Sequence, residues 1–282
     1  MRPSTLRRLR LCLVVALLGT GSWIANAQQS PFNKQRVTVK SGALSLAAYI
    51  YKPEGAGPFP TVIWNHGSEK NPGGAPQFDS IAKIFVPAGY VVFATVRRGH
   101  GGSEGKYIVE TLDAARARAD GSEGRLMVTL LETEQLDDQF AGVAYAKALP
   151  FVDKNRMVVA GCSFGGIQTL LAAEKSHDFK AALPISPAAQ SWALNALLQA
   201  RLKTAVRNID IPVFLIAPPK DDNLDPPRIL GDEAKRLGKT KFTTKIYPPT
   251  MPDGEQVHCF GGAKGFHNWA SDAVEFFQSV LK

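Results

Sequence analysis

The chain has 282 residues, of which 45% are hydrophobic and 21% are charged, and its formal net charge is +8. This is the composition of an ordinary globular protein, which excludes a disordered or fibrous chain. Four of the positive charges are arginines within the first ten residues, and elsewhere basic residues are interspersed with acidic ones. Nucleic-acid-binding proteins usually gather Lys and Arg in runs or on one face. We therefore expect a solvated surface and no nucleic-acid partner.

The first 27 residues have the three parts of a signal peptide. A positively charged start precedes the apolar run Leu11–Leu18, and the small residues of Ala25-Asn26-Ala27 form a cleavage site before Gln28. A membrane span would need about 20 apolar residues, but Gly19–Ser22 interrupts this run. The sequence therefore predicts a signal peptide over 1–27 and a mature domain over 28–282. We expect the mature domain to be periplasmic or secreted, without stable membrane insertion.

Short apolar runs rich in β-branched residues alternate with helical patterns along the mature chain. This alternation is typical of an α/β fold with a mostly parallel sheet and helices on both faces. The predicted strands are Val37–Val39, Leu46–Tyr51, Thr61–Asn65, Val91–Thr95, Met157–Ala160, Ala181–Ile185, Val213–Ala217 and Phe242–Tyr247. Apolar residues at helical spacing predict helices near 81–85, 136–144 and 270–281.

The stretch 106–133 fits this alternation poorly, because charged and apolar residues surround Gly121 and Gly124. Insertions after a strand often cover an active site. The segment is interpreted either as a lid or as a peripheral surface excursion.

The motif Gly161-Cys162-Ser163-Phe164-Gly165 lies between a predicted strand and a predicted helix. This strand–turn–helix setting is that of a nucleophile elbow, which presents a serine at the top of a sheet. A serine hydroxyl requires an adjacent base, and the base requires an orienting acid. The expected chain order is Ser, then Asp or Glu, then His. The acid candidates after Val213–Ala217 are Asp221, Asp222 and Asp225, and the base candidates are His258 and His267.

With these residues the chain resembles the dienelactone hydrolase-like branch of the α/β-hydrolase superfamily, which is related to the catalytic domains of prolyl-oligopeptidase-type peptidases. The segment 97–105, RRGHGGSEG, resembles that group's Arg-Gly-x-Gly-x-Ser loop, and 136–166 is also similar. The similarity spans about 61–282. It implies the α/β-hydrolase fold, with a mostly parallel eight-stranded sheet.

The resemblance also ranks the candidates. In 222–226 (DNLDP) an Asp is followed by an apolar residue and then Pro, as in the family's acid loop, which favours Asp222. His258 begins a His-x-Phe segment typical of the base position, whereas His267 is sufficiently explained by a polar role at the start of the last helix. The oxyanion donors should be the backbone N–H groups of Phe164 and of Ser68, which follows a family-like His-Gly pair. We expect His66 to be structural.

Dienelactone hydrolase itself uses a cysteine nucleophile, whereas this chain has Ser163. Cys162 precedes it, and we expect its side chain to point away from the substrate and to act as a packing residue. Cys162 and Cys259 are the cysteines that remain after signal cleavage. The sequence does not show whether they pair.

These observations predict a serine hydrolase that cleaves carboxylic esters through an acyl-enzyme, with a small-molecule ester as its partner. A peptidase of the prolyl oligopeptidase type is the nearest alternative. A non-catalytic binding protein on a hydrolase scaffold is the other, although such proteins usually lose a triad member. The His and Cys residues lack the spacing of metal ligands, and no phosphate-binding glycine loop is present. We therefore expect no metal and no cofactor.

Overall fold

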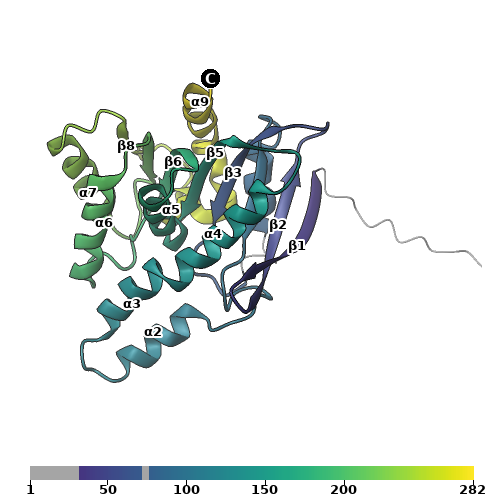
Figure 1. Ribbon diagram of the computed structural model, residues 1–282. Helices are drawn as coiled ribbons and strands as arrows, with labels where there is room; N and C mark the ends of the chain where they lie inside the picture. Colours follow the sequence, from purple (N-terminus) through teal and green to yellow (C-terminus); the bar gives the residue numbers. More distant parts are fainter. Residues whose placement is uncertain (1–31, 72–75) are drawn as a thin grey trace, which may run out of the picture. The chain divides into compact units, whose positions relative to one another are not determined.

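A computed structural model describes residues 32–71 and 76–282. The predicted signal peptide lies outside the described residues. Residues Pro31–Lys282 form one compact unit, whose centre is an eight-stranded sheet (Figure 1). Its strands are β1 (Asn33–Ser41), β2 (Leu44–Lys52), β3 (Phe59–Asn65), β4 (Val91–Thr95), β5 (Val152–Cys162), β6 (Phe179–Ile185), β7 (Val213–Ala217) and β8 (Phe242–Ile246).

The strand order across the sheet is β1-β2-β4-β3-β5-β6-β7-β8. The pairs β1–β2 and β2–β4 are antiparallel, and the pairs from β4 to β8 are parallel. This confirms the predicted mostly parallel eight-stranded sheet and the α/β-hydrolase fold. Because β3, β5 and β7 run in the same direction, the loops after their carboxyl ends meet at one edge of the sheet. Ligands of open α/β sheets bind at this edge.

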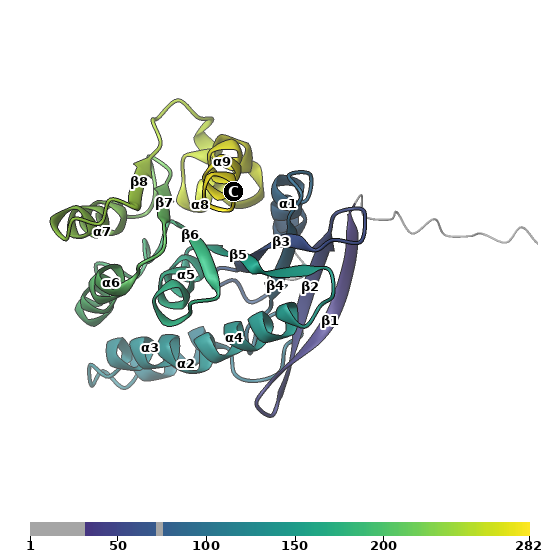
Figure 2. The ribbon, with the colours of Figure 1, turned by 45° about the horizontal axis from the view of Figure 1, so that its top comes forward.

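Helices cover both faces of the sheet (Figure 2). One face carries α4, α5, α6 and α7, and the other carries α1 and α9. The strands supply both cores in alternation, as a period of two residues requires. On β3, Ile63 packs toward the first set of helices, while Val62 and Trp64 pack toward the second. The helices of the two faces are α1 (Pro76–Phe85), α4 (Glu134–Lys147), α5 (Phe164–Lys175), α6 (Ala196–Asn208), α7 (Asp225–Arg236) and α9 (Ala270–Val280).

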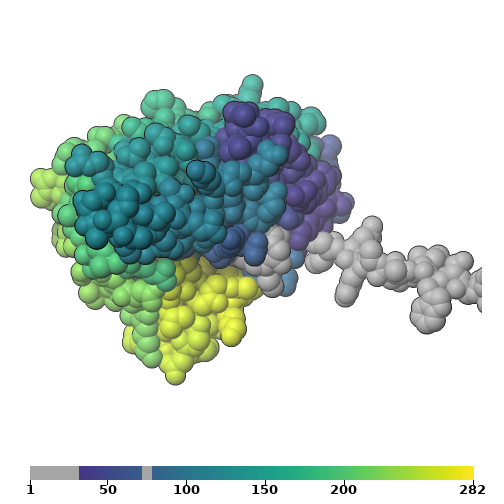
Figure 3. Space-filling model, turned by 90° about the horizontal axis from the view of Figure 1, so that it is seen from below, coloured from purple at the N-terminus to yellow at the C-terminus, as the bar shows by residue number. Residues whose placement is uncertain are grey.

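The segment 106–133, whose sequence does not follow the alternation of strand and helix patterns, forms a pair of helices. They are α2 (Ile108–Arg116) and α3 (Glu123–Glu132). Each helix buries a narrow apolar stripe, which includes Leu112 on α2 and Met127 and Leu131 on α3. Gly121 adopts a φ of 71° between them, a conformation that favours glycine. Figure 3 shows this blue-green segment spread over one face of the unit, beside the purple of β1 and β2.

After β8 the chain forms only short helical turns before α9. They are η2 (Asp253–Glu255), α8 (His258–Gly261), η3 (Gly262–Lys264) and η4 (Phe266–Asn268). Among the described helices, none combines the length and the apolar composition that crossing a membrane requires.

Candidate active site

Ser163 lies at the junction between β5 and α5. Its φ of 59° and ψ of −120° belong to a region that non-glycine residues rarely occupy. The backbone is held there by the hydrogen bond from the Ser163 N–H to the Ile185 carbonyl of β6, at 2.9 Å. A Cβ at Gly161 would meet the Asn65 carbonyl oxygen at 2.6 Å, so the motif requires glycine there. These features are those of a nucleophile elbow.

His258 forms the start of the α8 turn, after the last strand of the sheet. Its Nδ1 lies 2.6 Å from Oδ1 of Asp221, in the loop after β7. The Asp221 side chain is 0% exposed. The other ring nitrogen, Nε2, is buried and has no hydrogen-bond partner among the described residues. An imidazole whose Nδ1–H is bound to a carboxylate leaves Nε2 available to accept a proton.

The structure therefore corrects the sequence preference for Asp222 as the acid. The Asp222 side chain is 46% exposed, and its Oδ2 lies 3.9 Å from His258 Nδ1. That oxygen instead accepts a hydrogen bond from Gln190 Nε2 at 2.7 Å. Asp225 is exposed in the first turn of α7. The family-like spacing pointed to this loop, but the turn between β7 and α7 brings Asp221, one residue earlier, against the histidine.

His267, the alternative base, lies on η4. Its side chain is 56% exposed, and its Nε2 is 3.1 Å from Glu255 Oε2. It forms no contact with Asp221 or Ser163 among the described interactions, whereas His258 is paired with the buried carboxylate. The geometry favours His258 for the base position.

Two connections join the loops of the site. The Lys220 N–H donates to the Gln256 carbonyl at 2.8 Å, which links the acid loop to the histidine loop. Cys162 and Cys259 form a disulfide, with their Cα atoms 6.0 Å apart. Cys162 precedes the serine and Cys259 follows the histidine. Cys162 is buried, as a packing residue would be, but its bond to Cys259 also ties the elbow to the His258 turn.

The backbone after His258 has positive φ over four residues, of which the first three are in the left-handed helical region. Cys259, Phe260, Gly261 and Gly262 have φ values of 54°, 57°, 66° and 64°. This conformation costs roughly 1–2 kcal/mol for each residue that is not glycine. The disulfide and the complete burial of the Phe260 ring hold the turn in place. Strained backbone of this kind is retained where the surrounding structure fixes it.

The two residues expected to supply the oxyanion donors, Phe164 and Ser68, line the same cavity as Ser163. Phe164 is the first residue of α5, so its N–H has no acceptor within the helix. The Ser68 N–H has no acceptor among the described residues, and Ser68 lines the same cavity as Ser163. The Ser68 carbonyl accepts a hydrogen bond from the Tyr107 hydroxyl.

Behind Ser68 lie two buried histidines. Burial, aided by the Arg97 charge, holds the pKa of His66 well below its usual range and lowers that of His100 to about 4. Both rings are therefore neutral at physiological pH. His66 Nε2 accepts the Arg97 backbone N–H at 3.0 Å, so its proton is on Nδ1, which donates to the Gly67 carbonyl at 2.8 Å. His66 is structural, as expected.

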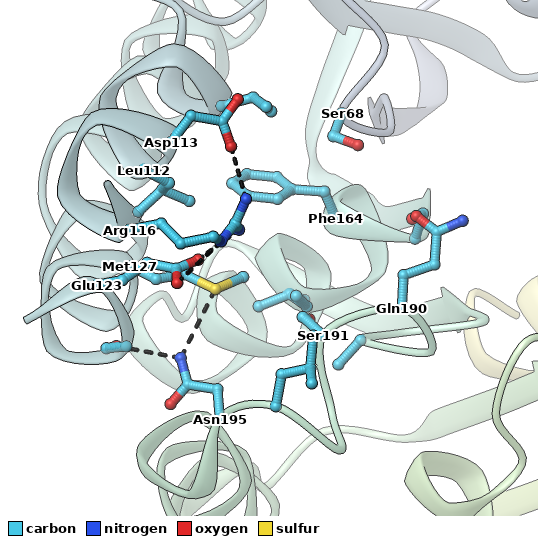
Figure 4. Close-up of a pocket in the computed structure, with 16 residues that line it drawn as sticks. Ser68, Leu112, Asp113, Arg116, Glu123, Met127, Phe164, Gln190, Ser191 and Asn195 are labelled. Carbon is cyan, nitrogen blue, oxygen red and sulfur yellow. Dashed lines mark hydrogen bonds and ion pairs between the residues drawn. The ribbon is translucent and has the colours of Figure 1, made fainter. Parts of the chain in front are cut away.

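A cavity of about 210 Å³ opens beside Ser163. Figure 4 shows Leu112 and Met127 of the α2–α3 pair on one side, Gln190 and Ser191 on the other, and the Phe164 ring between them. Most of its exposed wall is apolar. At the rim, Arg116 forms ion pairs with Asp113 at 2.7 Å and with Glu123 at 2.5 Å. The pair with Glu123 joins α2 to α3, whereas the pair with Asp113 lies within α2.

Comparisons with known proteins bear on the fold and on part of the sequence. The sequence profile described as the prolyl oligopeptidase family matches residues 126–198. An esterase of Pyrococcus furiosus superposes with a TM-score of 0.66 at 17% identity, over 90% of this chain and 95% of that one. An acylaminoacyl peptidase of Pyrococcus horikoshii superposes with a TM-score of 0.68 at 20% identity, over 89% of this chain and 42% of that one. The chain has the α/β-hydrolase fold, and its residues 126–198 are similar to the prolyl oligopeptidase family.

Among curated proteins, the chain is similar to the quorum-quenching protein AidA of Acinetobacter baumannii, with 28% identity over 169 residues. The match covers 59% of this chain and 47% of the relative, so it spans about half the length of that protein. The solved structures that share the fold include both esterases and peptidases.

The described part of the chain also offers one group with metal-ligand distances, namely Asp221, Asp222 and His258, whose ligand atoms lie within 4.8 Å of one another. One of these contacts is the 2.6 Å bond between His258 and Asp221. A bond this short between imidazole and carboxylate is that of an acid–base pair, and a metal would have to break it.

The sequence did not predict several features of this candidate site. Gln190, which holds Asp222, lies in an irregular turn after β6 that has no periodic pattern. Tyr107 reaches the Ser68 loop from the start of α2. Arg97 belongs to the recognised RRGHGGSEG segment, but the sequence does not indicate that its side chain is 1% exposed beneath the active site.

Proposed function

We propose that the protein is an exported serine hydrolase that cleaves carboxylic esters of small or medium-sized, largely apolar acyl groups. The observation that carries this proposal is Ser163 at a nucleophile elbow beside a largely apolar cavity. The buried His258–Asp221 pair is joined to that elbow by the Cys162–Cys259 disulfide.

In the proposed mechanism the Ser163 hydroxyl attacks the ester carbonyl while His258 Nε2 accepts its proton. The imidazolium that forms is stabilised by Asp221, which accepts the Nδ1–H. The negative oxygen of the tetrahedral intermediate is bound by the N–H groups of Phe164 and Ser68. His258 then protonates the leaving alcohol, and a water molecule activated by the same histidine hydrolyses the serine ester.

The cavity supports an ester with a modest apolar group. Its volume of about 210 Å³ is below the 300–1,000 Å³ range of drug-sized pockets. Its walls offer apolar side chains of α2, α3 and α5, but the polar groups at its rim are already paired with one another. The α2–α3 pair thus acts as a lid in this proposal. The esterase neighbour, which this chain matches over 95% of its length, agrees with this assignment.

The test is a panel of p-nitrophenyl esters with acyl chains of two to twelve carbons, run beside short peptide anilides. We expect the highest kcat/KM for a short or medium acyl group and little anilide cleavage.

Ser163→Ala should abolish both hydrolysis and fluorophosphonate labelling, and labelling that persists on another serine would refute the assignment of Ser163 as the nucleophile. Met127→Trp should fill the cavity and disfavour the longer acyl groups while sparing acetate esters. If the dependence of kcat/KM on acyl chain length is unchanged in this variant, the acyl group binds outside this cavity.

The alternative is a peptidase, which the family match over 126–198 favours. It predicts that peptide anilides are cleaved faster than matched esters of the same acyl group. A non-catalytic protein on this scaffold would turn over neither class and would not react with the fluorophosphonate.

Export is supported by the composition of 1–27 and by the disulfide, since such bonds persist mainly in oxidising compartments. N-terminal sequencing of protein from the native host should find Gln28 at or near the start. Recovery of an intact Leu11–Leu18 segment would reject cleavage.

A further inference from the structure

Arg97 follows β4 and is buried at 1% exposure without an ion-pair partner among the described residues. Its Nη2 donates to the carbonyls of His66 and Gly67, at 2.8 and 2.7 Å. Its Nε and Nη1 have no partner in the described part of the chain. Burial lowers the pKa of the guanidinium only to about 10, so it is charged at neutral pH. The charges of Glu69 and Asp138 favour the charged form, but neither carboxylate forms an ion pair with Arg97. A buried charge without a direct partner is costly, which calls for an explanation at this position.

Arg97 binds the carbonyl of the peptide unit whose N–H is one of the two proposed oxyanion donors. The Gly67 carbonyl and the Ser68 N–H belong to the same peptide unit. This peptide is planar, and in the trans form its N–H points opposite to its C=O. The carbonyl receives Arg97 Nη2 at 2.7 Å and His66 Nδ1–H at 2.8 Å. Two donors on the carbonyl polarise the peptide and make its N–H a stronger donor.

Arg97 also contacts the other donor residue. Its Cζ lies 4.9 Å from the centroid of the Phe164 ring, within the range of a cation–π interaction. Phe164 directly follows the nucleophile. One buried cation therefore contacts both segments whose N–H groups flank Ser163.

Building on the proposed hydrolase function, we propose that Arg97 is a positioning residue for the oxyanion hole. It fixes the Gly67–Ser68 peptide with its N–H directed away from the guanidinium, and it polarises that peptide. Its buried positive charge also favours the negative charge that develops on the acyl oxygen. This charge appears in the transition state and not in the bound ester, so the contribution belongs to kcat.

The experiment compares Arg97→Met, which removes the charge, with Arg97→Lys, which keeps it. Arg201→Met is the matched control, because Arg201 is a largely buried arginine that pairs with Glu132 and Glu174 away from the cavity. All rates are divided by the number of serines labelled by a fluorophosphonate at completion, which removes the effect of misfolded protein. The inhibition constant of a boronic acid, whose serine adduct resembles the tetrahedral intermediate, is measured on each variant.

We expect Arg97→Met to lower kcat about 10–100-fold, on the scale of a weakened oxyanion donor, with KM changed by less than about threefold. Boronate affinity should fall in parallel, Arg97→Lys should recover most of both losses, and Arg201→Met should change neither. Equal defects in Arg97→Met and Arg97→Lys, a loss confined to KM, or unchanged boronate affinity would overturn the proposal. Should Arg97→Met fail to fold, Arg97→Gln, a neutral donor, takes its place in the same comparison. An inactive Ser163→Ala beside a fully active Arg97→Met would reject this role while leaving the hydrolase proposal intact.

Discussion

The acid of the proposed triad is tested most directly by exchanging the two neighbouring aspartates for asparagine, one at a time. Asp221 is 0% exposed and lies 2.6 Å from His258 Nδ1, whereas Asp222 is 46% exposed and lies 3.9 Å away. When His258 becomes charged during turnover, a carboxylate about 4 Å from the imidazolium centre at a partly buried site contributes about 4 kcal/mol. In water at a similar separation the contribution is about 1 kcal/mol.

Asp221→Asn should therefore lower kcat about 1,000-fold, since each 1.36 kcal/mol is a factor of ten. Asp222→Asn should lower it about fivefold at most by the same conversion. Both side chains keep their shape, so circular dichroism should show two folded proteins. The assay is kcat/KM on one p-nitrophenyl ester, with active sites counted by fluorophosphonate labelling. An Asp222→Asn protein that is nearly inactive beside a functional Asp221→Asn protein would refute the assignment and restore the sequence preference.

Three further expectations follow from the same contacts. His258→Ala should lose several orders of magnitude in turnover, while His267→Ala should keep at least about a tenth of it, because triad members act as a unit; the reverse ranking would make His267 the base. Cys259→Ser opens a loop of 97 residues, which corresponds to about 5 kcal/mol of unfolding free energy. Chemical denaturation should show this loss, and the ester assay should show a drop in kcat; full activity and stability would contradict a positioning role for the bond. Burial lowers the pKa of His100 to about 4 in the folded protein, so on acidification this histidine is protonated in the unfolded chain before it is protonated in the folded one. About 3 kcal/mol of the unfolding free energy present at pH 7 should therefore be lost between pH 6.5 and 4. Denaturation of wild type and His100→Asn at pH 7, 5.5 and 4.5 should show a smaller decline in the variant, and parallel declines would place the pH dependence elsewhere.

The strands were predictable because their signal is local. Val91–Thr95 and Val213–Ala217 are apolar runs buried on both faces, and they match β4 and β7 in full. The elbow was predictable because its motif and the flanking strand and helix patterns lie together in the sequence, although the contacts that require Gly161 and Gly165 come from Asn65 at the end of β3.

The identity of the acid was not predictable in the same way. Asp221 and Asp222 are adjacent, have the same side chain and lie in one loop, so only the turn between β7 and α7 decides which of them faces His258. The disulfide and the position of Arg97 depend on segments that are far apart in sequence. The helical periodicity of apolar residues is weak in the α2–α3 pair, because each of these helices buries only a few residues, such as Leu112 and Met127.

The Cys162–Cys259 bond also bears on how the protein is handled. The same sequence exists as two chemical species, a dithiol and a disulfide, and they differ at the residues that flank Ser163 and His258. Preparations from a reducing cytoplasm and from an oxidising compartment would then differ in turnover although their masses differ by only two hydrogen atoms. A thiol reductant added to a storage buffer would convert one species into the other. Specific activities are comparable between preparations only when the free thiols of each have been counted.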